Sequence, residues 1–313
     1  MIKILKRLYR RSSLIYMLLH PIKISYNFLY YRIMPNKIII KRNYKKVFGT
    51  KINLDNPVTL NEKINWLKLH DRSDLHTLCA DKFAVREHIK NKIGKEFLVP
   101  LILQTEDVKD ITEDNIPDYP VIIKTNHDSS GGIIIRNKEN IDFFYVRKKL
   151  NKLMKRNYYT YSLEWQYKNI KPCVIVEKLL IDKNGGIPFD YKVHCFNGKA
   201  ITVQVDLNRG TENHARNWYD LNWKREPFWW SSVKKCGTVT DPSDKDVKKP
   251  ENFELMLKLS EKLAGDFIYV RVDWYEVNGF LYFGELTFHH DSGMRPIYPR
   301  KWDKILGEKL RLS

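Results

Sequence analysis

The sequence predicts an α+β fold built from antiparallel strand pairs and separate helices. Short apolar runs rich in Val, Ile and Tyr recur along the chain, as is typical of strands. Asn197-Gly198 and Asn278-Gly279 each join two such runs, and Asn-Gly is the strongest short signal for a β-hairpin. Strands and helices follow one another in blocks, which favours this class over a doubly wound parallel sheet.

The expected elements can be placed in order along the 313 residues. Helices are expected over about 60–69, from 81 to 93, over 142–157 and from 250 to 264. Strands are expected over 97–103, 120–124, 133–136, 174–180, 191–196, 200–207 and on both sides of 278–279. The remaining long segments, 105–118 and 208–250, are a polar connector and an irregular region.

The helix that starts near Asp81 shows how these assignments are made. The Asp81 carboxylate is a good N-cap, because it can accept hydrogen bonds from the free N–H groups of a first helical turn. Val85, Ile89 and Ile93 then recur on one face at four-residue spacing. Gly94 is a natural helix stop.

The positive charge is concentrated at the N-terminus. The formal net charge is +18, yet residues 1–54 hold thirteen Lys or Arg and no acid, which leaves +5 for the other 259 residues. A nucleic-acid-binding body would carry a basic patch of its own, so no nucleic-acid partner is expected. The four Cys show no CxxC or paired spacing, as is typical of reduced thiols in a cytosolic protein.

Residues 1–54 are expected to form a basic amphipathic extension. Its longest uncharged run, 12–22, is too short to span a bilayer, and no small-residue cleavage site of a signal peptide follows it. Association with an anionic membrane surface fits this pattern and predicts a cytoplasmic protein at the inner face of the plasma membrane. A helical layer packed on the body and contact with RNA are the alternatives.

Two acids interrupt the apolar runs on either side of the 278–279 turn. Counted back from that turn, Asp273 and Glu285 lie near each other, and Arg271 shares the face of Asp273 because side chains alternate along a strand. Two carboxylates can bind Mg²⁺ when substrate phosphates complete its shell. The alternative is a pair of strand-end carboxylates bound to surface Lys.

A polar loop follows the expected strand at 120–124. Lys124 ends that strand, and the loop from Thr125 to Gly132 contains small residues whose backbone N–H groups can cradle phosphate while the Lys supplies charge. This segment is neither a Walker A nor a GxGxxG motif, and an ordinary hairpin turn is an equal alternative.

Two further strands carry charges. Glu177 and Lys178 break an apolar strand whose end can present backbone groups to an adenine, although a strand-end ion pair is the simpler interpretation. Asp190 and Lys192 share one face with His194, and this face either lines a polar cleft or meets solvent. Arg209 lies in the next loop, where cationic side chains suit an anionic ligand or simply form a solvated charge run.

Taken in order, these segments resemble the ATP-grasp superfamily. The shared series runs from Asp81-Lys82 through Ile123-Lys124, Val176-Glu177-Lys178-Leu179-Leu180, Asp190-Tyr191-Lys192 and Arg271-Val272-Asp273 to Gly284-Glu285-Leu286-Thr287. In motif order it is similar to D-alanine–D-alanine ligase over about 60–300. The segments 124–132, 190–198 and 283–293 resemble, more narrowly, the TupA-like ATP-grasp group named for teichuronopeptide biosynthesis, whose members are associated with surface polysaccharide synthesis.

The resemblance implies an ATP-grasp fold, in which two α+β subdomains sandwich ATP. The expected organisation is a basic extension at 1–54, a helical linking region at 55–118, a small subdomain at 119–183 and a large subdomain at 184–313. The small subdomain would carry the phosphate lid and adenine strand, and the large one the metal and acceptor site.

The resemblance also implies roles for individual residues, with ATP and Mg²⁺ as cofactors. Phosphates would be bound by Lys82, Lys124 and a mobile lid formed by Ser129, Ser130, Gly131 and Gly132. Adenine would be held by Glu177, Lys178 and Leu180, and the ribose by Asp190. Magnesium would be bound by Asp273, Glu285 and Thr287. Catalysis would involve Arg271, which stabilises the tetrahedral intermediate, together with Lys192 and Arg209.

One position departs from the family pattern. Thr287 stands where the family usually has an Asn metal ligand, which puts the second metal in doubt, and Asp291 is a possible substitute. The short region before Lys82 also does not resemble a complete N-terminal substrate domain.

The implied function is an ATP- and Mg²⁺-dependent carboxylate–amine ligase that acts through an acylphosphate. It would join an amino acid or another amine to a uronic acid of a bacterial surface polysaccharide. The alternatives are a glycosyltransferase of polysaccharide synthesis, for which the chain lacks a good DxD motif, and a non-catalytic basic protein that binds membrane or nucleic acid. The second alternative gives Asp273 and Glu285 no use.

Overall fold

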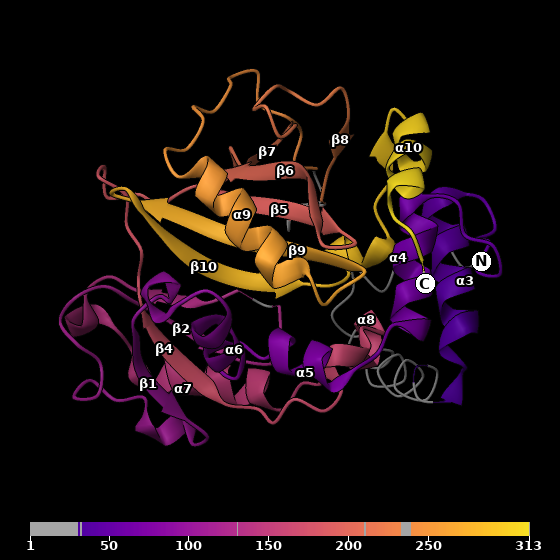
Figure 1. The fold of residues 1–313 in the computed structure, drawn as a ribbon. Coiled ribbons are helices and arrows are strands. Elements are labelled where there is room, and N and C mark those ends of the chain that lie inside the picture. The colour runs from indigo at the N-terminus through magenta and orange to yellow at the C-terminus, as the bar shows by residue number, and fades with distance from the viewer. Residues whose placement is uncertain (1–30, 32, 130, 210, 233–238, 313) are drawn as a thin grey trace.

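Two antiparallel sheets organise the protein. The computed structural model describes residues 31–312 apart from 32, 130, 210 and 233–238. In these residues one sheet has five strands, another has four, and a short pair forms a third. Figure 1 shows the two larger sheets in separate halves of the molecule. The expected antiparallel α+β architecture is therefore confirmed.

The five-stranded sheet has the order β10-β9-β5-β6-β7. Its strands are β5 (Asp190–Phe196), β6 (Lys199–Leu207), β7 (Ala215–Tyr219), β9 (Tyr269–Val277) and β10 (Phe280–Thr287). Helix α9 (Phe253–Ala264) crosses one face of this sheet (Figure 1), and its Met256 and Leu263 belong to one buried cluster with Val193 and Val272. The opposite face carries polar side chains, so this antiparallel sheet has one apolar and one polar face.

Both Asn-Gly pairs form the turns that the sequence predicts. Asn278 and Gly279 have φ of 52° and 78°, and Asn197 and Gly198 have φ of 47° and 80°. A two-residue turn with positive φ at both positions matches the right-handed twist of the strands that it joins. These turns fix the pairing of β9 with β10 and of β5 with β6.

The four-stranded sheet has the order β1-β4-β2-β3. Its strands are β1 (Leu101–Thr105), β2 (Val121–Thr125), β3 (Ile133–Ile135) and β4 (Val174–Lys178). Helix α7 (Phe143–Met154) starts at Asp142, whose carboxylate accepts a hydrogen bond from the backbone N–H of Tyr145. The helix buries Val146 and Leu150 against this sheet.

A helical layer lies at one side of the molecule (Figure 1). It contains α3 (Asn36–Phe48), α4 (Leu60–His70) and α10 (Lys301–Lys309). Thr59 and Glu62 form a capping box at the start of α4, which satisfies its first free N–H groups. Helix α3 buries Ile39, Ile40 and Tyr44. The packed-layer alternative therefore holds for 36–48, while residues 1–30 lie outside the described part of the chain.

Several elements differ from the expectation or were not expected. The first strand begins at Leu101 rather than 97, because residues 95–97 form a 3₁₀ turn. The irregular region 208–250 contains β7, whose buried polar side chains hide its strand pattern. The remaining elements are α5 (Asp74–Ala80), α6 (Val85–Lys92), α8 (Tyr159–Ser162), β8 (Trp229–Trp230), β11 (Ile297–Tyr298) and the 3₁₀ helices η1 (Lys95–Phe97), η2 (Val108–Asp110), η3 (Lys138–Asn140), η4 (Trp165–Tyr167) and η5 (His290–Gly293).

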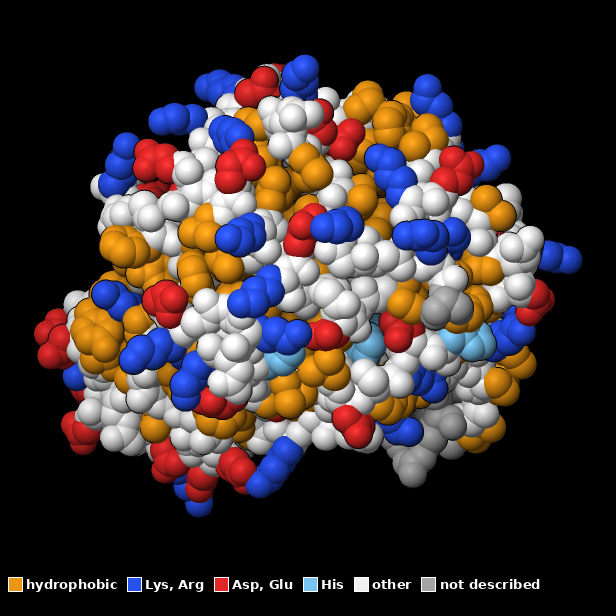
Figure 2. All heavy atoms as spheres, viewed as in Figure 1, with side chains coloured by type: hydrophobic (Ala, Val, Ile, Leu, Met, Phe, Trp, Pro, Cys, Tyr) orange, Lys and Arg blue, Asp and Glu red, His pale blue; other side chains and the backbone are white. Residues whose placement is uncertain are grey.

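Charged side chains of both signs are mixed on the surface. On the face shown in Figure 2, basic and acidic side chains are interspersed over both halves of the molecule. The three described Cys residues, Cys79, Cys173 and Cys195, are buried and free, in agreement with structural thiols. The proposed subdomain boundaries remain a prediction.

Close packing of α10 on the start of α4 can be tested at Gly307. A Cβ at this position would lie 2.7 Å from the backbone N of Leu60, with the carbonyl of Val58 closer still. We expect Gly307→Ala to lower the free energy of unfolding by about 2 kcal/mol, because the backbone must shift. Gly265→Ala is the matched control, since its Cβ would meet nothing closer than 3.8 Å. Equal denaturation midpoints for the two variants would contradict this packing.

Candidate active site

The polar face of the five-stranded sheet carries a ladder of opposite charges. Lys192 on β5 lies opposite Asp273 on β9, and His194 lies opposite Arg271. The Lys192 Nζ donates to Asp273 Oδ2 at 2.6 Å and to Asp190 Oδ2 at 2.5 Å. These side chains are buried, so each charge is offset by an opposite one instead of by water.

A β-bulge turns Glu285 toward this face. Phe283 pairs with Trp274 and Leu286 pairs with Val272, so Gly284 and Glu285 together oppose the single residue Asp273. Without the extra residue, Glu285 would share the apolar face of Phe283, because side chains alternate along a strand. Gly284 suits this close approach, since a Cβ would lie 3.1 Å from the Asp273 carbonyl and 3.2 Å from the Tyr275 ring, and these neighbours would have to shift slightly.

Arg271 binds both candidate metal carboxylates. Its Nε donates to Asp273 Oδ1 at 2.6 Å, and its Nη2 donates to Asp273 Oδ2 at 2.6 Å and to Glu285 Oε1 at 3.0 Å. The remaining Nη1 donates to His290 Nδ1 at 2.8 Å, so this imidazole accepts and carries its proton on Nε2. One guanidinium nitrogen therefore touches both carboxylates, which confirms that they lie close together.

The charges on this face shift the pKa of both acids. Burial raises the pKa of Asp273, against the opposing effect of Arg271 and Lys192. Burial also disfavours the charged form of Glu285, but Arg271, Lys82 and Lys192 outweigh it and lower its pKa to about 2. Glu285 is therefore ionised at neutral pH, as a metal ligand must be.

The residues present suit a magnesium ion. Asp273 and Glu285 offer oxygen ligands at one point, although the described residues include no group of three or more His, Cys, Asp and Glu that could hold a metal. Two carboxylates are enough for Mg²⁺ when phosphates supply further ligands. Thr287 Oγ1 donates to Glu285 Oε1 at 3.1 Å, which orients that carboxylate. Asp291 is occupied elsewhere, because its Oδ2 accepts from Ser232 at 2.6 Å.

The candidate phosphate side faces this carboxylate pair. Lys82 donates through Nζ to the Asp128 carbonyl and through its backbone N–H to the Asn126 carbonyl. Burial lowers the pKa of Lys82, while the Glu285 charge opposes that effect, so the two side chains interact across the site. Asp81 accepts from the N–H groups of Phe83 and Ala84 in the turn before α6, which starts at Val85 with Ala84 as its N-cap instead of at Asp81.

The candidate lid is only partly described. Gly131 has a φ of 82°, and a Cβ at Gly132 would lie 2.5 Å from the Ile122 side chain, so both positions require glycine. Ser129 hydrogen-bonds Tyr158, whereas Ser130 lies outside the described residues. Motion of this loop stays a prediction.

The candidate adenine strand is held by a three-residue ion cluster. Glu177 on β4 binds Lys124 at 2.9 Å and Arg86 at 2.9 Å. The ion-pair interpretation of this strand is thus realised, and it places Lys124 beside Glu177. Lys178 is exposed and Leu180 is half-buried next to this pair in sequence. Arg86 was not identified from the sequence, because it lies on α6 far from the motif.

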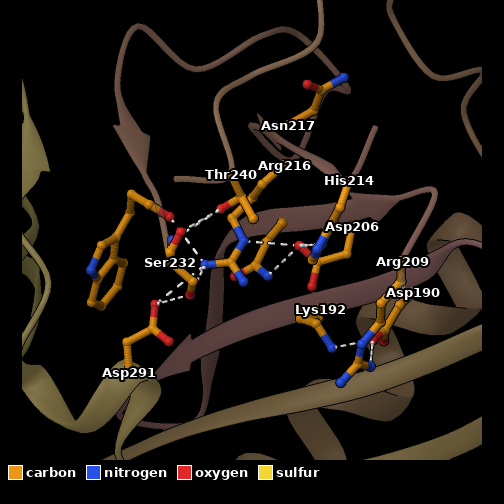
Figure 3. A network of polar contacts seen from close by, with 12 residues as sticks. Asp190, Lys192, Asp206, Arg209, His214, Arg216, Asn217, Ser232, Thr240 and Asp291 are labelled. Carbon is orange, nitrogen blue, oxygen red and sulfur yellow. Dashed lines mark hydrogen bonds and ion pairs between the residues drawn. The ribbon is translucent and has the colours of Figure 1, made fainter. Parts of the chain in front are cut away.

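A second buried network adjoins the first (Figure 3). Arg216 on β7 donates to Asp206 Oδ1 at 2.9 Å, to Ser232 Oγ at 2.9 Å and to Asp291 Oδ2 at 3.3 Å. In the same view Arg209 reaches Asp190 Oδ2 at 2.6 Å, next to Lys192. Arg209 therefore lies beside the candidate site residues Asp190 and Lys192, whereas the Arg216 network could not be predicted from a region expected to be irregular.

Comparison with known families identifies the chain. Residues 62–311 match the sequence model of the family described as TupA-like ATPgrasp. The chain belongs to the TupA-like ATP-grasp family. Family membership confirms the resemblance and the ATP-grasp fold that the order of motifs implies. No curated protein matches the chain in sequence.

Solved structures with some likeness are ligases of the same superfamily. D-alanine–D-alanine ligase from Bacillus anthracis has 17% identity and a TM-score of 0.40, over 73% of this chain and 66% of that one. D-cycloserine synthetase has 12% identity and a TM-score of 0.38, over 75% and 71%. The ATP-grasp ligase PsnB, in complex with Mg, ADP and a precursor variant, has 11% identity and a TM-score of 0.39, over 76% and 60%. The chain thus spans just under two thirds of the Bacillus anthracis ligase, and these likenesses bear on neither substrate nor site.

The neutral state of His290 can be tested by pH. Burial, followed by the charges around it, holds the pKa of His290 well below its ordinary value of 6.5. Below that pH the unfolded chain binds a proton that the folded protein does not, so acid destabilises the fold. Relative to His290→Gln, we expect the wild type to lose about 1.4 kcal/mol of unfolding free energy per pH unit below about pH 6.

Urea denaturation from pH 8 to pH 5 measures this difference. The comparison at pH 8 is the reference, because His290 is neutral there in both the folded and the unfolded state. Parallel stability curves for wild type and variant across this range would show that His290 carries no such penalty.

Proposed function

We propose that the protein is an ATP- and Mg²⁺-dependent ligase that joins a carboxylate to an amine. The family supports this activity, and one geometric observation carries it: Asp273 and Glu285 meet at a single nitrogen of Arg271. The carboxylate is proposed to be a uronic acid of a bacterial surface polysaccharide, and the amine an amino acid or a related compound.

The side chains suit the two halves of such a reaction. Lys82, Lys124 and the backbone of the 129–132 loop would hold the phosphates of ATP, and Asp190 and the end of β4 its nucleoside. Asp273 and Glu285, oriented by Thr287, would hold Mg²⁺, which supplies charge neutralisation. Phosphoryl transfer depends mainly on such positioning and charge stabilisation.

The second half is attack of the amine on the acylphosphate. Arg271 is fixed by Asp273 and His290, so its charge is preorganised for the oxyanion that forms on the acyl carbon. Lys192 and Arg209 gather at Asp190 and would be released toward anionic ligands when they bind.

Ligase activity predicts ADP release that depends on both substrates. With Mg-ATP, a uronic-acid glycan and a panel of amino acids, the wild type should release ADP only when glycan and a suitable amine are present. We expect Glu285→Gln to lower this rate by about 100-fold or more, because the metal loses a charged ligand. Glu254→Gln is the matched control, since Glu254 is exposed on α9 and pairs only with Lys249 among the described residues.

The outcomes separate the functions considered. Amine-dependent ADP release that Glu285→Gln abolishes establishes the ligase and names its substrates. ATP binding without turnover keeps the fold but means that the acceptor is another compound. Absence of ATP binding refutes the proposal and favours a glycosyltransferase or a binding protein.

We also propose that residues 1–54 bring the protein to an anionic membrane, at the inner face of the bacterial plasma membrane. The segment holds thirteen bases and no acid, and α3 turns its Lys37, Lys41, Lys45 and Lys46 outward. None of the helices in the described residues has the length and apolarity needed to cross a bilayer. Attraction to anionic lipid is worth about 1 kcal/mol per basic residue near the surface.

Vesicle binding tests this attachment without removing the packed helix α3. Replacing Lys3, Lys6, Arg7 and Arg10 by Gln should weaken sedimentation with phosphatidylglycerol vesicles by about 100-fold or more at low salt. The control replaces Lys148, Lys149, Lys152 and Lys155, which are exposed on α7, and removes the same charge. Equal losses in both variants would mean that the attraction is not specific to the N-terminus.

A further inference from the structure

An acid and a base are buried together beside the site but do not form an ion pair. Lys68 on α4 is 2% exposed and Glu164, just before η4, is 5% exposed. Neither side chain belongs to the ion pairs within 4 Å that the described residues form. A buried charge without a direct counterion is costly, so such a pair needs a reason.

Ser292 links the two side chains. Its Oγ donates to Glu164 Oε1 at 2.8 Å, and its carbonyl accepts from Lys68 Nζ at 2.8 Å. The other Glu164 oxygen accepts from Gln166 Nε2 at 3.3 Å. Ser292 is half-buried whereas Glu164 is buried, so the hydroxyl is the more accessible end of this chain of hydrogen bonds.

The backbone that presents Ser292 is strained. Asp291, Ser292 and Gly293 have φ of 45°, 58° and 62°, a left-handed turn in which two of the three residues carry a Cβ. Such conformations cost about 1–3 kcal/mol each and cluster at functional sites. Here the surroundings enforce the turn, since Arg216 binds Asp291 and Asn65 Nδ2 donates to the Gly293 carbonyl.

The turn lies next to the candidate reaction centre. It starts a few residues after Glu285 and directly follows His290, which accepts a hydrogen bond from Arg271. The charges of Asp291 and Glu285 both raise the pKa of Glu164. The charge of Glu164 in turn raises the pKa of Tyr158, which hydrogen-bonds Ser129 of the candidate lid. Glu164 therefore lies within electrostatic range of Glu285, one of the two candidate metal carboxylates.

The titration of the pair suits proton transfer near neutral pH. Burial raises the pKa of Glu164 to about 7, with Lys68 opposing and Asp291 and Glu285 adding to the rise. Burial lowers the pKa of Lys68 to about 8, against the pull of Glu164. Tyr158 and Tyr167, the other titratable groups that interact with Glu164, both have a raised pKa and stay neutral.

The proposed reaction requires a base. An amino group is an ammonium ion at neutral pH and has no lone pair, so a proton must leave before nitrogen attacks the acylphosphate. A general base contributes most when its pKa lies near the working pH. The residues assigned to phosphate and metal are cations or carboxylates held by cations, and none of them is suited to accept this proton.

We propose that Glu164 accepts the proton of the incoming ammonium group through the hydroxyl of Ser292, an inference that rests on the proposed ligase function. The ammonium group gives a proton to Ser292 Oγ as Ser292 passes its own proton to Glu164 Oε1. The nitrogen lone pair then forms the C–N bond, and the acyl carbon–oxygen bond breaks as phosphate leaves. The second nitrogen proton leaves with phosphate or solvent. Lys68 is a positioning residue that keeps Glu164 ionised before the transfer.

Comparison of two nucleophiles tests this role. Hydroxylamine is a weaker base than an amino acid and is largely neutral at pH 7, so it attacks an acylphosphate without a general base. With Mg-ATP and an oligomer of glucuronate, we expect Glu164→Gln and Ser292→Ala to lower amide formation with an amino acid by about 100-fold or more. Hydroxamate formation should stay within about threefold of the wild type.

A matched control separates proton transfer from packing. Asp303→Asn also replaces a buried acid, one whose pKa burial raises, but it lies on α10 and caps Asn61 instead of facing the site. This variant should leave the ratio of the two rates unchanged. Equal losses for both nucleophiles in Glu164→Gln, or no loss for either, would overturn the inference. Absence of wild-type turnover with both nucleophiles would instead count against the uronic-acid substrate of the proposed function, on which this inference rests.

The pH profile of Lys68→Met gives an independent readout. Because Lys68 lowers the pKa of Glu164, its removal should raise that pKa further and move the acidic limb of the amino-acid rate to higher pH. The hydroxylamine rate should not show this displacement. An acidic limb at the wild-type position would show that Glu164 is not the group that accepts the proton.

Discussion

Charge compensation by Arg271 is the constraint on which the site depends. Two carboxylates, Asp273 and Glu285, share a single guanidinium that is itself buried, and a neutral imidazole accepts a hydrogen bond from its Nη1. Isolated carboxylates could not stay ionised in such a place. The arrangement keeps Glu285 charged before any ligand arrives, whereas burial still raises the pKa of Asp273. A metal ion would replace part of a positive charge that is already there. A metal ion would thus take over part of the role of Arg271 at carboxylates that are already removed from water, so that binding requires little further desolvation of these acids.

The two faces of the five-stranded sheet divide the work of stability and chemistry. Valines on one face pack beneath α9, and their neighbours in sequence supply the charged ladder on the other. Rigid strands therefore hold Lys192, Arg271 and Asp273 in place. The helical layer of α3, α4 and α10 contributes Lys68 from α4.

The sequence was sufficient for most strands, for both hairpins and for the family, because alternation and Asn-Gly turns are local signals. It also singled out Lys192 and Asp273 as candidate site residues, although only the structure shows that they pair. It could not predict contacts that join distant segments, such as Arg86 with Glu177, or Ser292 with Glu164. Strand β7 was not predicted from the sequence, because its buried residues include the polar Arg216 and Asn217, which are held by hydrogen bonds. Burial of polar side chains leaves no apolar pattern to detect. The roles proposed for individual residues, including Thr287 and the 129–132 loop, remain predictions.

The bulge at Gly284 means that the number of residues in β10 before Glu285 decides on which face of the sheet this acid lies. Side chains along a regular strand alternate between the polar and the apolar face of the sheet. The number of residues between the turn and Glu285 therefore decides which face the acid occupies. Insertion or deletion of an even number of residues would leave Glu285 on the polar face. An odd number would move the side chain of every later residue to the opposite face. This hairpin should therefore tolerate substitutions far better than single insertions or deletions. Homologues should keep the spacing between Asn278 and Glu285 even where the letters between them differ.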